Sequence, residues 1–173
     1  NVKDALRFLR RSYLKKILFR QKLPWYLVLG AENTGKTSLL AMSGLHLTST
    51  DSLTLQHITN TAYCQWFFSK EAVFIDTSGN LMLPEYIDMT TLSFWKKFIT
   101  LLHRYRRLHP INGLILCIDL LNFQNKSFEQ QRQYVDILRH HIQTLSSSIP
   151  VYLIFTRCDR IQGFSEFFHI LSN

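Results

Sequence analysis

Three short runs of consecutive apolar residues limit the fold of this chain more than any other feature of the sequence. They lie at residues 25–29, 113–118 and 151–155, and segments with helical periodicity separate them. Strands that are apolar on both faces are typical of a parallel sheet with helices on both sides. The sequence therefore predicts a three-layer α/β domain with a mainly parallel sheet.

Two more strands are expected at residues 63–68 and 72–75, where a Ser-Lys pair turns a hairpin between them. These two strands should therefore pair antiparallel. Helices are expected where apolar residues recur at three- and four-residue spacing, and a capping box at Ser127 and Gln130 marks the start of one of them. The expected helices span 36–42, 92–107, 127–145 and 164–171, and loops are expected at 44–61 and 77–90.

Positive charge is concentrated at the start of this 173-residue chain, whose net charge is +8. Residues 1–22 hold eight Lys and Arg and one acid, a net charge of +7. Residues 23–173 hold twelve basic and eleven acidic residues, a net charge of +1. Because the basicity belongs to one segment, no general nucleic-acid-binding face is predicted. The expected organisation is a basic segment, 1–22, followed by one domain, 23–173.

Residues 2–20 of the basic segment have the pattern of an extra N-terminal amphipathic helix. Two interpretations of its basic side stay open: a solvated face of a helix that packs on the domain, or contact with an anionic membrane surface. No run of about 18 apolar residues occurs, so no transmembrane helix is predicted. The chain begins at Asn1 rather than at Met, and we expect it to be a piece of a longer protein.

The cysteines and paired histidines give no metal pattern. Cys64, Cys117 and Cys158 are odd in number, and two of them lie in or beside apolar runs, which favours buried thiols in a reducing compartment over a disulfide. No Cys/His spacing is typical of a zinc site. His140 and His141 have no carboxylate at ligand spacing and are expected to be surface or packing residues.

Residues 30–37, Gly-Ala-Glu-Asn-Thr-Gly-Lys-Thr, match the pattern G-x-x-x-x-G-K-[ST] at every fixed position. They follow an expected strand and open an expected helix, which is the context that the motif requires. Gly30 and Gly35 let the backbone curl so that its N–H groups face phosphate oxygens. Lys36 is expected to reach the β and γ phosphates, and the Thr37 hydroxyl to bind Mg²⁺. The sequence therefore predicts a P-loop that binds a nucleotide.

A second motif, D-x-x-G at residues 76–79, follows one strand of the expected hairpin. Asp76 is expected to hold Mg²⁺ through water, and Gly79 to offer its N–H group to the γ phosphate. A Mg²⁺-sensing threonine should come from the loop before the hairpin. Thr61 is the first candidate there, and Thr59 is the second.

A third motif, Thr-Arg-Cys-Asp at residues 156–159, stands where G proteins carry N-K-x-D. Thr156 replaces Asn and Arg157 replaces Lys, whereas Asp159 is kept. A carboxylate at this position accepts hydrogen bonds from guanine N1 and N2, which adenine does not offer, so GTP and GDP are favoured over ATP. The alternative interpretation is a loop with a helix-capping Asp.

The order of the three motifs is that of small GTPases, so the predicted fold is a P-loop NTPase of the small-GTPase type. The last strand and helix of a full G domain have no counterpart in the pattern. Lys36, Thr61 and Asn80 are the candidates for a catalytic role, and Thr37, Thr61 and Asp76 for Mg²⁺. The residues expected to contact the nucleotide are Gly30, Glu32, Asn33, Thr34, Gly35, Lys36, Thr37, Ser38, Gly79, Thr156, Arg157 and Asp159.

Three residues depart from the small-GTPase pattern. Glu32 stands where small GTPases have Gly and is expected to crowd either the γ phosphate or a catalytic arginine from a partner. Asn80 stands where Ras-like proteins have a water-orienting Gln and is one methylene shorter. Hydrolysis without a partner is therefore expected to be slow, below about 1 s⁻¹. Two interpretations of Asn33 stay open: a K⁺ ligand beside the phosphates, or a residue that tolerates the turn.

Blocks spread along the chain carry a family resemblance. They include Leu-Pro-Trp-Tyr-Leu-Val-Leu-Gly at 23–30, Glu-Ala-Val-Phe-Ile-Asp-Thr at 71–77 and Ile-Pro-Val-Tyr-Leu-Ile-Phe-Thr at 149–156. With these blocks the chain resembles, over about residues 23–168, the cytoplasmic domain of the IcmF/TssM family. That family consists of inner-membrane components of bacterial type IVB and type VI secretion systems.

The resemblance implies an NTPase-like domain at the cytoplasmic face of the inner membrane, within a larger transmembrane protein. It also implies other inner-membrane and cytoplasmic secretion subunits as partners, and a membrane-proximal place for residues 1–22. Two functions stay open: a slow GTPase, or ATPase, that switches or powers a channel, and a nucleotide-stabilised scaffold that does not cycle. The intact Lys36 favours the first, whereas Glu32 and Asn80 favour the second.

Overall fold

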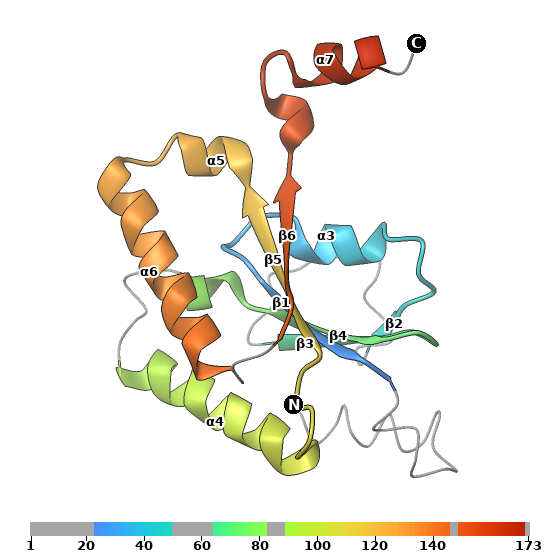
Figure 1. Ribbon diagram of the computed structural model, residues 1–173, viewed down its shortest axis with the longest axis vertical. Helices are drawn as coiled ribbons and strands as arrows, with labels where there is room; N and C mark the ends of the chain where they lie inside the picture. Colours follow the sequence, from blue (N-terminus) through green and yellow to red (C-terminus); the bar gives the residue numbers. More distant parts are fainter. Residues whose placement is uncertain (1–22, 50–63, 83–88, 146–148, 172–173) are drawn as a thin grey trace.

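The computed structural model describes residues 23–49, 64–82, 89–145 and 149–171. Their elements form one six-stranded sheet with helices on both of its faces, as Figure 1 shows. This confirms the predicted three-layer α/β architecture. The expected N-terminal helix at 2–20 and most of the loop at 44–61 lie outside the described residues.

The strand order in the sheet is β2-β3-β4-β1-β5-β6. β1 pairs in parallel with β4 and β5, and β5 pairs in parallel with β6. β3 runs antiparallel to both β4 and β2, which confirms the predicted hairpin. The strands are β1 (Trp25–Leu29), β2 (Thr48–Ser49), β3 (Cys64–Phe68), β4 (Val73–Thr77), β5 (Gly113–Asp119) and β6 (Val151–Thr156). The two-residue strand β2 was expected to be part of a loop.

The described helices are α3 (Lys36–Ala41), α4 (Met89–Tyr105), α5 (Leu120–Gln124), α6 (Phe128–Thr144) and α7 (Phe164–Leu171), with 3₁₀ turns η1 (Gly79–Met82) and η3 (Cys158–Arg160). The expected capping box opens α6, because the Ser127 hydroxyl accepts from the Gln130 N–H and the Gln130 side chain accepts from the Ser127 N–H. α5 was not expected. Among the described residues, no helix has both the length and the apolar character needed to cross a membrane.

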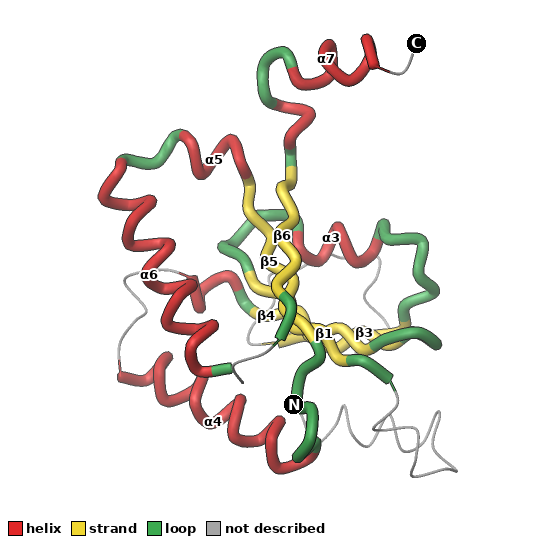
Figure 2. Tube along the Cα trace, viewed as in Figure 1, coloured by secondary structure: helices red, strands yellow, loops and turns green. Residues whose placement is uncertain are grey.

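The larger core lies between the sheet and the helices α4 and α6 (Figure 2). Trp25 and Trp66 meet there edge to face, with ring centroids 5.3 Å apart. The opposite face packs on α3 through Val28, Leu40 and Cys117. All three cysteines are free thiols, but Cys117 alone among them is buried as predicted, whereas Cys64 and Cys158 are half-buried.

The edge of the sheet formed by β6 is more exposed to solvent than the sequence predicts. β6 was expected to be buried on both faces, but the side chains of Tyr152, Leu153 and Phe155 are about half exposed. The reason is position: β6 is the last strand in the sheet order, and among the described residues it pairs only with β5. Figure 1 shows α7, which follows β6, lying apart from the other helices.

An arginine just after α4 fixes the entry to β1. Arg106 is 5% exposed and lies over the Trp25 ring, 4.8 Å from its centroid. Its guanidinium donates to Asn112 Oδ1 over 3.0 Å, and the same oxygen accepts from the backbone N–H of Trp25 over 2.9 Å. The end of α4, the start of β1 and the segment before β5 are thereby joined.

Candidate functional site

The loop between β1 and α3 is curled tightly enough to exclude side chains at key positions. A Cβ atom on Gly30 would lie 2.5 Å from the carbonyl oxygen of Cys117. Gly35 has φ 82° and ψ 15°, and no side chain caps the helix that begins after it. Asn33 has a φ of 58°, which is left-handed and favours Gly or Asn. We refer to residues 30–37 as the phosphate loop, after the prediction from its sequence.

Lys36 lies inside the curl of the phosphate loop. Its side chain is buried, and its ammonium donates to the carbonyl oxygens of Gly30 and Ala31 over 2.9 and 2.8 Å. Burial lowers the pKa of Lys36, and the nearby carboxylate of Asp76 opposes this shift. The loop therefore encloses a cation, and its carbonyl oxygens offset part of the cost of burying that charge.

Asp76 reaches the start of α3 from the neighbouring strand. It stands opposite Val28 in the parallel register, and its Oδ2 atom accepts a 2.6 Å hydrogen bond from the Thr37 hydroxyl. Its other oxygen, Oδ1, is buried and has no hydrogen-bond partner among the described residues. Burial raises the pKa of Asp76. The sequence placed Asp76 just after its strand, but β4 continues to Thr77 and carries the carboxylate within the sheet.

A pair of oxygen ligands thus stands at the phosphate loop, which tests the fit of the expected Mg²⁺. Mg²⁺ prefers a carboxylate or hydroxyl oxygen and completes its shell with water and substrate phosphates. The partnerless Oδ1 of Asp76 and the Thr37 hydroxyl have this chemistry. The described residues hold no group of three or more His, Cys, Asp or Glu that could bind a metal alone. These residues fit a cation that arrives with a phosphate.

The turn after β4 lies directly against the phosphate loop. A Cβ atom on Gly79 would lie 2.2 Å from the backbone nitrogen of Glu32 and 2.6 Å from its Cγ. Glu32 therefore packs toward Gly79, and its side chain is only partly exposed. Thr77 ties the same turn to β1, because its hydroxyl donates to the Val28 carbonyl over 2.8 Å. Asn80 is half-buried, and its N–H donates to the Ser78 hydroxyl over 3.3 Å.

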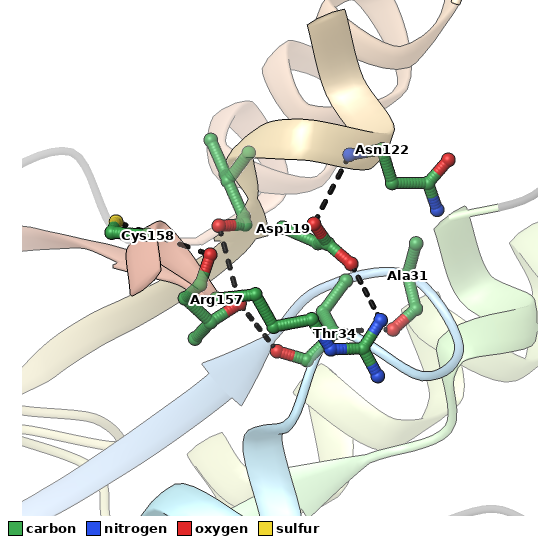
Figure 3. Close-up of polar contacts among 8 residues, drawn as sticks. Ala31, Thr34, Asp119, Asn122, Arg157 and Cys158 are labelled. Carbon is green, nitrogen blue, oxygen red and sulfur yellow. Dashed lines mark hydrogen bonds and ion pairs between the residues drawn. The ribbon is translucent and has the colours of Figure 1, made fainter. Parts of the chain in front are cut away.

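The turn after β6 reaches the phosphate loop from the other side. The Thr156 hydroxyl donates to the carbonyl oxygens of Thr34 over 2.7 Å and Ile118 over 3.3 Å. The Arg157 guanidinium forms an ion pair of 2.7 Å with Asp119 Oδ2, as Figure 3 shows. Asp159 is exposed on η3.

Asp119 is the residue that sequence reasoning missed. It ends β5 and begins α5, and its Oδ1 atom accepts from the backbone N–H of Asn122 over 3.1 Å (Figure 3). The available signal was an Asp at the end of an apolar run, which is typical of a helix N-cap. The five-residue α5 has too little periodicity for that signal to stand out.

The floor of the phosphate loop is apolar and holds two weak acids. Burial raises the pKa of Cys117 to about 11 and that of Tyr134 to about 12. Both groups therefore stay protonated near pH 7. The Lys and Asp residues buried at this end of the sheet, in the described part of the chain, are Lys36, Asp76 and Asp119.

The structure brings most of the expected site residues together around the phosphate loop. Lys36, Thr37, Asp76, Gly79 and Thr156 all make the contacts given above. Asn33 is exposed, and Ser38 is half-buried in the first turn of α3. Thr61 and Thr59 lie outside the described residues.

Two comparisons relate the chain to known proteins. Residues 92–173 match the model of the IcmF-related N-terminal domain. The chain is also similar to the type VI secretion system component TssM1 of Pseudomonas aeruginosa, with 29% identity over 180 residues that cover 98% of this chain. The match covers 16% of the length of that relative. Both findings support the relationship to the IcmF/TssM family.

Proposed function

We propose that this chain, as a relative of IcmF/TssM, is the Mg²⁺-dependent nucleotide-binding domain of a secretion-system component. On this proposal it lies at the cytoplasmic face of the bacterial inner membrane as part of a larger transmembrane protein. Its partners are other inner-membrane and cytoplasmic subunits of the same system. The relative is a type VI secretion component, and the match covers a small part of it.

One observation carries the nucleotide proposal: the buried ammonium of Lys36 and the buried carboxylate of Asp76 lie near enough to each other to interact electrostatically. Among the described residues, the Lys36 ammonium donates to carbonyl oxygens of the loop that encloses it, and an incoming phosphate is a stronger acceptor than a carbonyl. In the described part of the chain, Asp76 keeps one oxygen without a hydrogen-bond partner. Both groups are already desolvated in the protein, so binding of a phosphate with its cation adds little to the desolvation cost of Lys36 and Asp76 themselves.

The identity of the base rests on Asp159. Its carboxylate is exposed at the end of the sheet that holds the phosphate loop, where it can accept from the two guanine donors. We therefore propose GTP and GDP as the nucleotides, with ATP as the less favoured alternative.

Mg²⁺ would be held by the Thr37 hydroxyl and, through water, by Asp76, and would neutralise charge on the β and γ phosphates. Lys36 would bind the same phosphates, and the Gly79 N–H would point to the γ phosphate. Glu32 packs against Gly79, so a negative side chain borders that position. We therefore propose slow hydrolysis.

A scaffold that binds nucleotide without cycling is the second candidate. It is favoured by the Glu32–Gly79 contact and by the short side chain of Asn80, which replaces the expected Gln. Single-turnover measurements separate the two functions: GDP formation that depends on Mg²⁺ supports the GTPase, whereas intact GTP after hours supports the scaffold.

The deciding experiment is calorimetric titration of GTP, GDP and ATP with Mg²⁺ into the purified protein. We expect tighter binding of GTP and GDP than of ATP, and a loss of at least about tenfold in affinity for Lys36→Met. The matched control is Lys97→Met, which removes an exposed lysine of α4. No binding of any nucleotide at millimolar concentration would refute the proposal, and tighter binding of ATP would overturn the assignment of guanine.

A further inference from the structure

The turn after β6 is anchored on both sides by contacts that come from different elements. Thr156 is tied to the phosphate loop through the Thr34 carbonyl, and Arg157 is tied to Asp119 at the end of β5. Asp159, the expected base reader, lies two residues beyond Arg157. Figure 3 shows the Arg157 guanidinium beside the phosphate loop and directed at Asp119.

Because Asp119 is buried, its carboxylate needs the two partners that this arrangement gives it. Its side chain is 4% exposed, and its two oxygens are used separately, one by the Asn122 N–H and the other by Arg157. A buried carboxylate that loses its cation costs more than a surface pair contributes, because the charge stays desolvated. The position of the Arg157 side chain, and with it the turn, is therefore tied to β5 and α5.

This arrangement also gives a reason for Arg at position 157, where G proteins have Lys. Arg157 has a φ of 55°, so its backbone is in the left-handed region and begins η3. From there the planar guanidinium reaches back to Asp119. Lys carries a point charge on a flexible stem and holds a fixed geometry less well.

We propose that the Asp119–Arg157 pair is a positioning device that holds the Asp159 turn against the phosphate loop and so sets how long a guanine nucleotide stays bound. The inference rests on the proposed function and deepens it. Arg157 acts through the turn, and the phosphates are bound by the loop and Lys36. Loss of the ion pair should therefore weaken binding of the base by Asp159, whereas the phosphate loop and Lys36 should still bind the phosphates.

Two measurements, both with Mg²⁺, test whether the pair affects the base end of the nucleotide and not its phosphate end. The first is stopped-flow release of a fluorescent GDP analogue, and the second is calorimetry with inorganic triphosphate. For Arg157→Gln we expect release to accelerate at least about tenfold and the preference for GDP over ADP to shrink, while triphosphate affinity changes less than about twofold. Arg157→Lys should restore part of the slow release. The pair Arg157→Gln with Asp119→Asn should release no faster than Arg157→Gln alone, because both changes remove one interaction.

The matched control is Arg139→Gln, which removes the ion pair of 3.3 Å with Asp136 on α6, where the side chains are 65% and 55% exposed. It should change neither GDP release nor triphosphate affinity. Equal weakening of GDP and triphosphate in Arg157→Gln would overturn the inference, because it would show general damage to the loop. Unchanged release would overturn it while the nucleotide function stands. Failure of the unaltered protein to bind any nucleotide would refute the proposed function, and the inference with it.

Discussion

The Thr37 hydroxyl donates a 2.6 Å hydrogen bond to Asp76, and so joins the start of α3 to a strand 39 residues further along the chain. Asp76 is buried, and burial raises its pKa above the usual 3.8. Because the native pKa lies above the unfolded one, ionisation of Asp76 at neutral pH opposes folding.

Asp76→Asn should therefore stabilise the ligand-free protein and weaken its response to Mg²⁺. The amide is the same size, and its oxygen still accepts from Thr37. We expect the unfolding midpoint to rise by about 2–4 °C, which is the shift for about 1 kcal/mol in a domain of this size. The extra thermal stabilisation that Mg²⁺ gives with GDP should disappear. Asp136→Asn, in the exposed pair on α6, is the control, and a lower midpoint for Asp76→Asn would contradict the argument.

Gly79→Ala should separate the turn after β4 from the phosphate loop. The added Cβ would meet the nitrogen and Cα of Glu32 at 2.2 and 2.5 Å, so one backbone must move. We expect the free energy of unfolding to fall by about 1–3 kcal/mol, as in other overpacked sites, and nucleotide affinity to fall with it. Asn80→Ala, one residue further on, adds no atom and serves as the control. If chemical denaturation gave the same free energy of unfolding for Gly79→Ala as for the unaltered protein, the contact between Gly79 and Glu32 would have room for a methyl group, and the prediction would be wrong.

The sequence predicted where strands and helices lie better than it predicted how far each one is buried. The apolar runs at 25–29 and 113–118 and the capping box at Ser127 are local signals, and the structure confirms their elements. The exposure of β6 could not be predicted from its run of apolar residues, because it depends on strand order, which long-range pairing decides.

In the candidate site, too, local motifs could be predicted from the sequence, whereas a long-range contact could not. Lys36, Thr37 and Asp76 belong to motifs with fixed spacing, so the sequence predicted that they lie together. Asp119 and its partner Arg157 are 38 residues apart and come from different elements, and no local pattern connects them. Such a contact becomes visible only when the register of β5 and β6 is known.

Arg106 should matter for stability, although it is one of several basic residues at the end of α4. It is buried on the Trp25 ring and donates to Asn112, whereas Arg107 is exposed. We expect Arg106→Met to lower the free energy of unfolding by about 2–3 kcal/mol, because a cation–π contact and a partly buried hydrogen bond are lost. Arg107→Met should change it by less than about 0.5 kcal/mol. Urea denaturation of both variants checks this, and equal effects would contradict it.

Asn33 should act through its backbone. Its φ of 58° is in the left-handed region, and its side chain is exposed. We expect Asn33→Ala to lower the free energy of unfolding by about 1 kcal/mol and Asn33→Gly to be nearly neutral. Nucleotide binding and turnover should then be the same in KCl and NaCl. Faster turnover in KCl that is lost in Asn33→Gly would instead assign Asn33 as a K⁺ ligand.

His141 should make the domain less stable in mild acid. It is buried on α6 against Trp95, with ring centroids 4.6 Å apart, and its Nδ1–H donates to the Ile137 carbonyl over 2.8 Å. Its Nε2 atom is buried without a hydrogen-bond partner in the described part of the chain. Burial, with a smaller contribution from the neighbouring His140, lowers the pKa of His141 below the usual 6.5.

The direction of this pH dependence follows from the difference between the pKa of His141 in the unfolded chain and in the native protein. In the unfolded chain His141 takes up a proton near pH 6.5, whereas in the native protein it stays neutral to lower pH. The free energy of unfolding should therefore fall as pH drops from about 7 towards 5. His141→Phe, which keeps an aromatic ring against Trp95, should flatten that dependence, whereas His140→Gln, at an exposed position, should preserve most of it. Urea denaturation between these pH values measures both slopes, and an equally steep fall in His141→Phe would assign the acid sensitivity to another group.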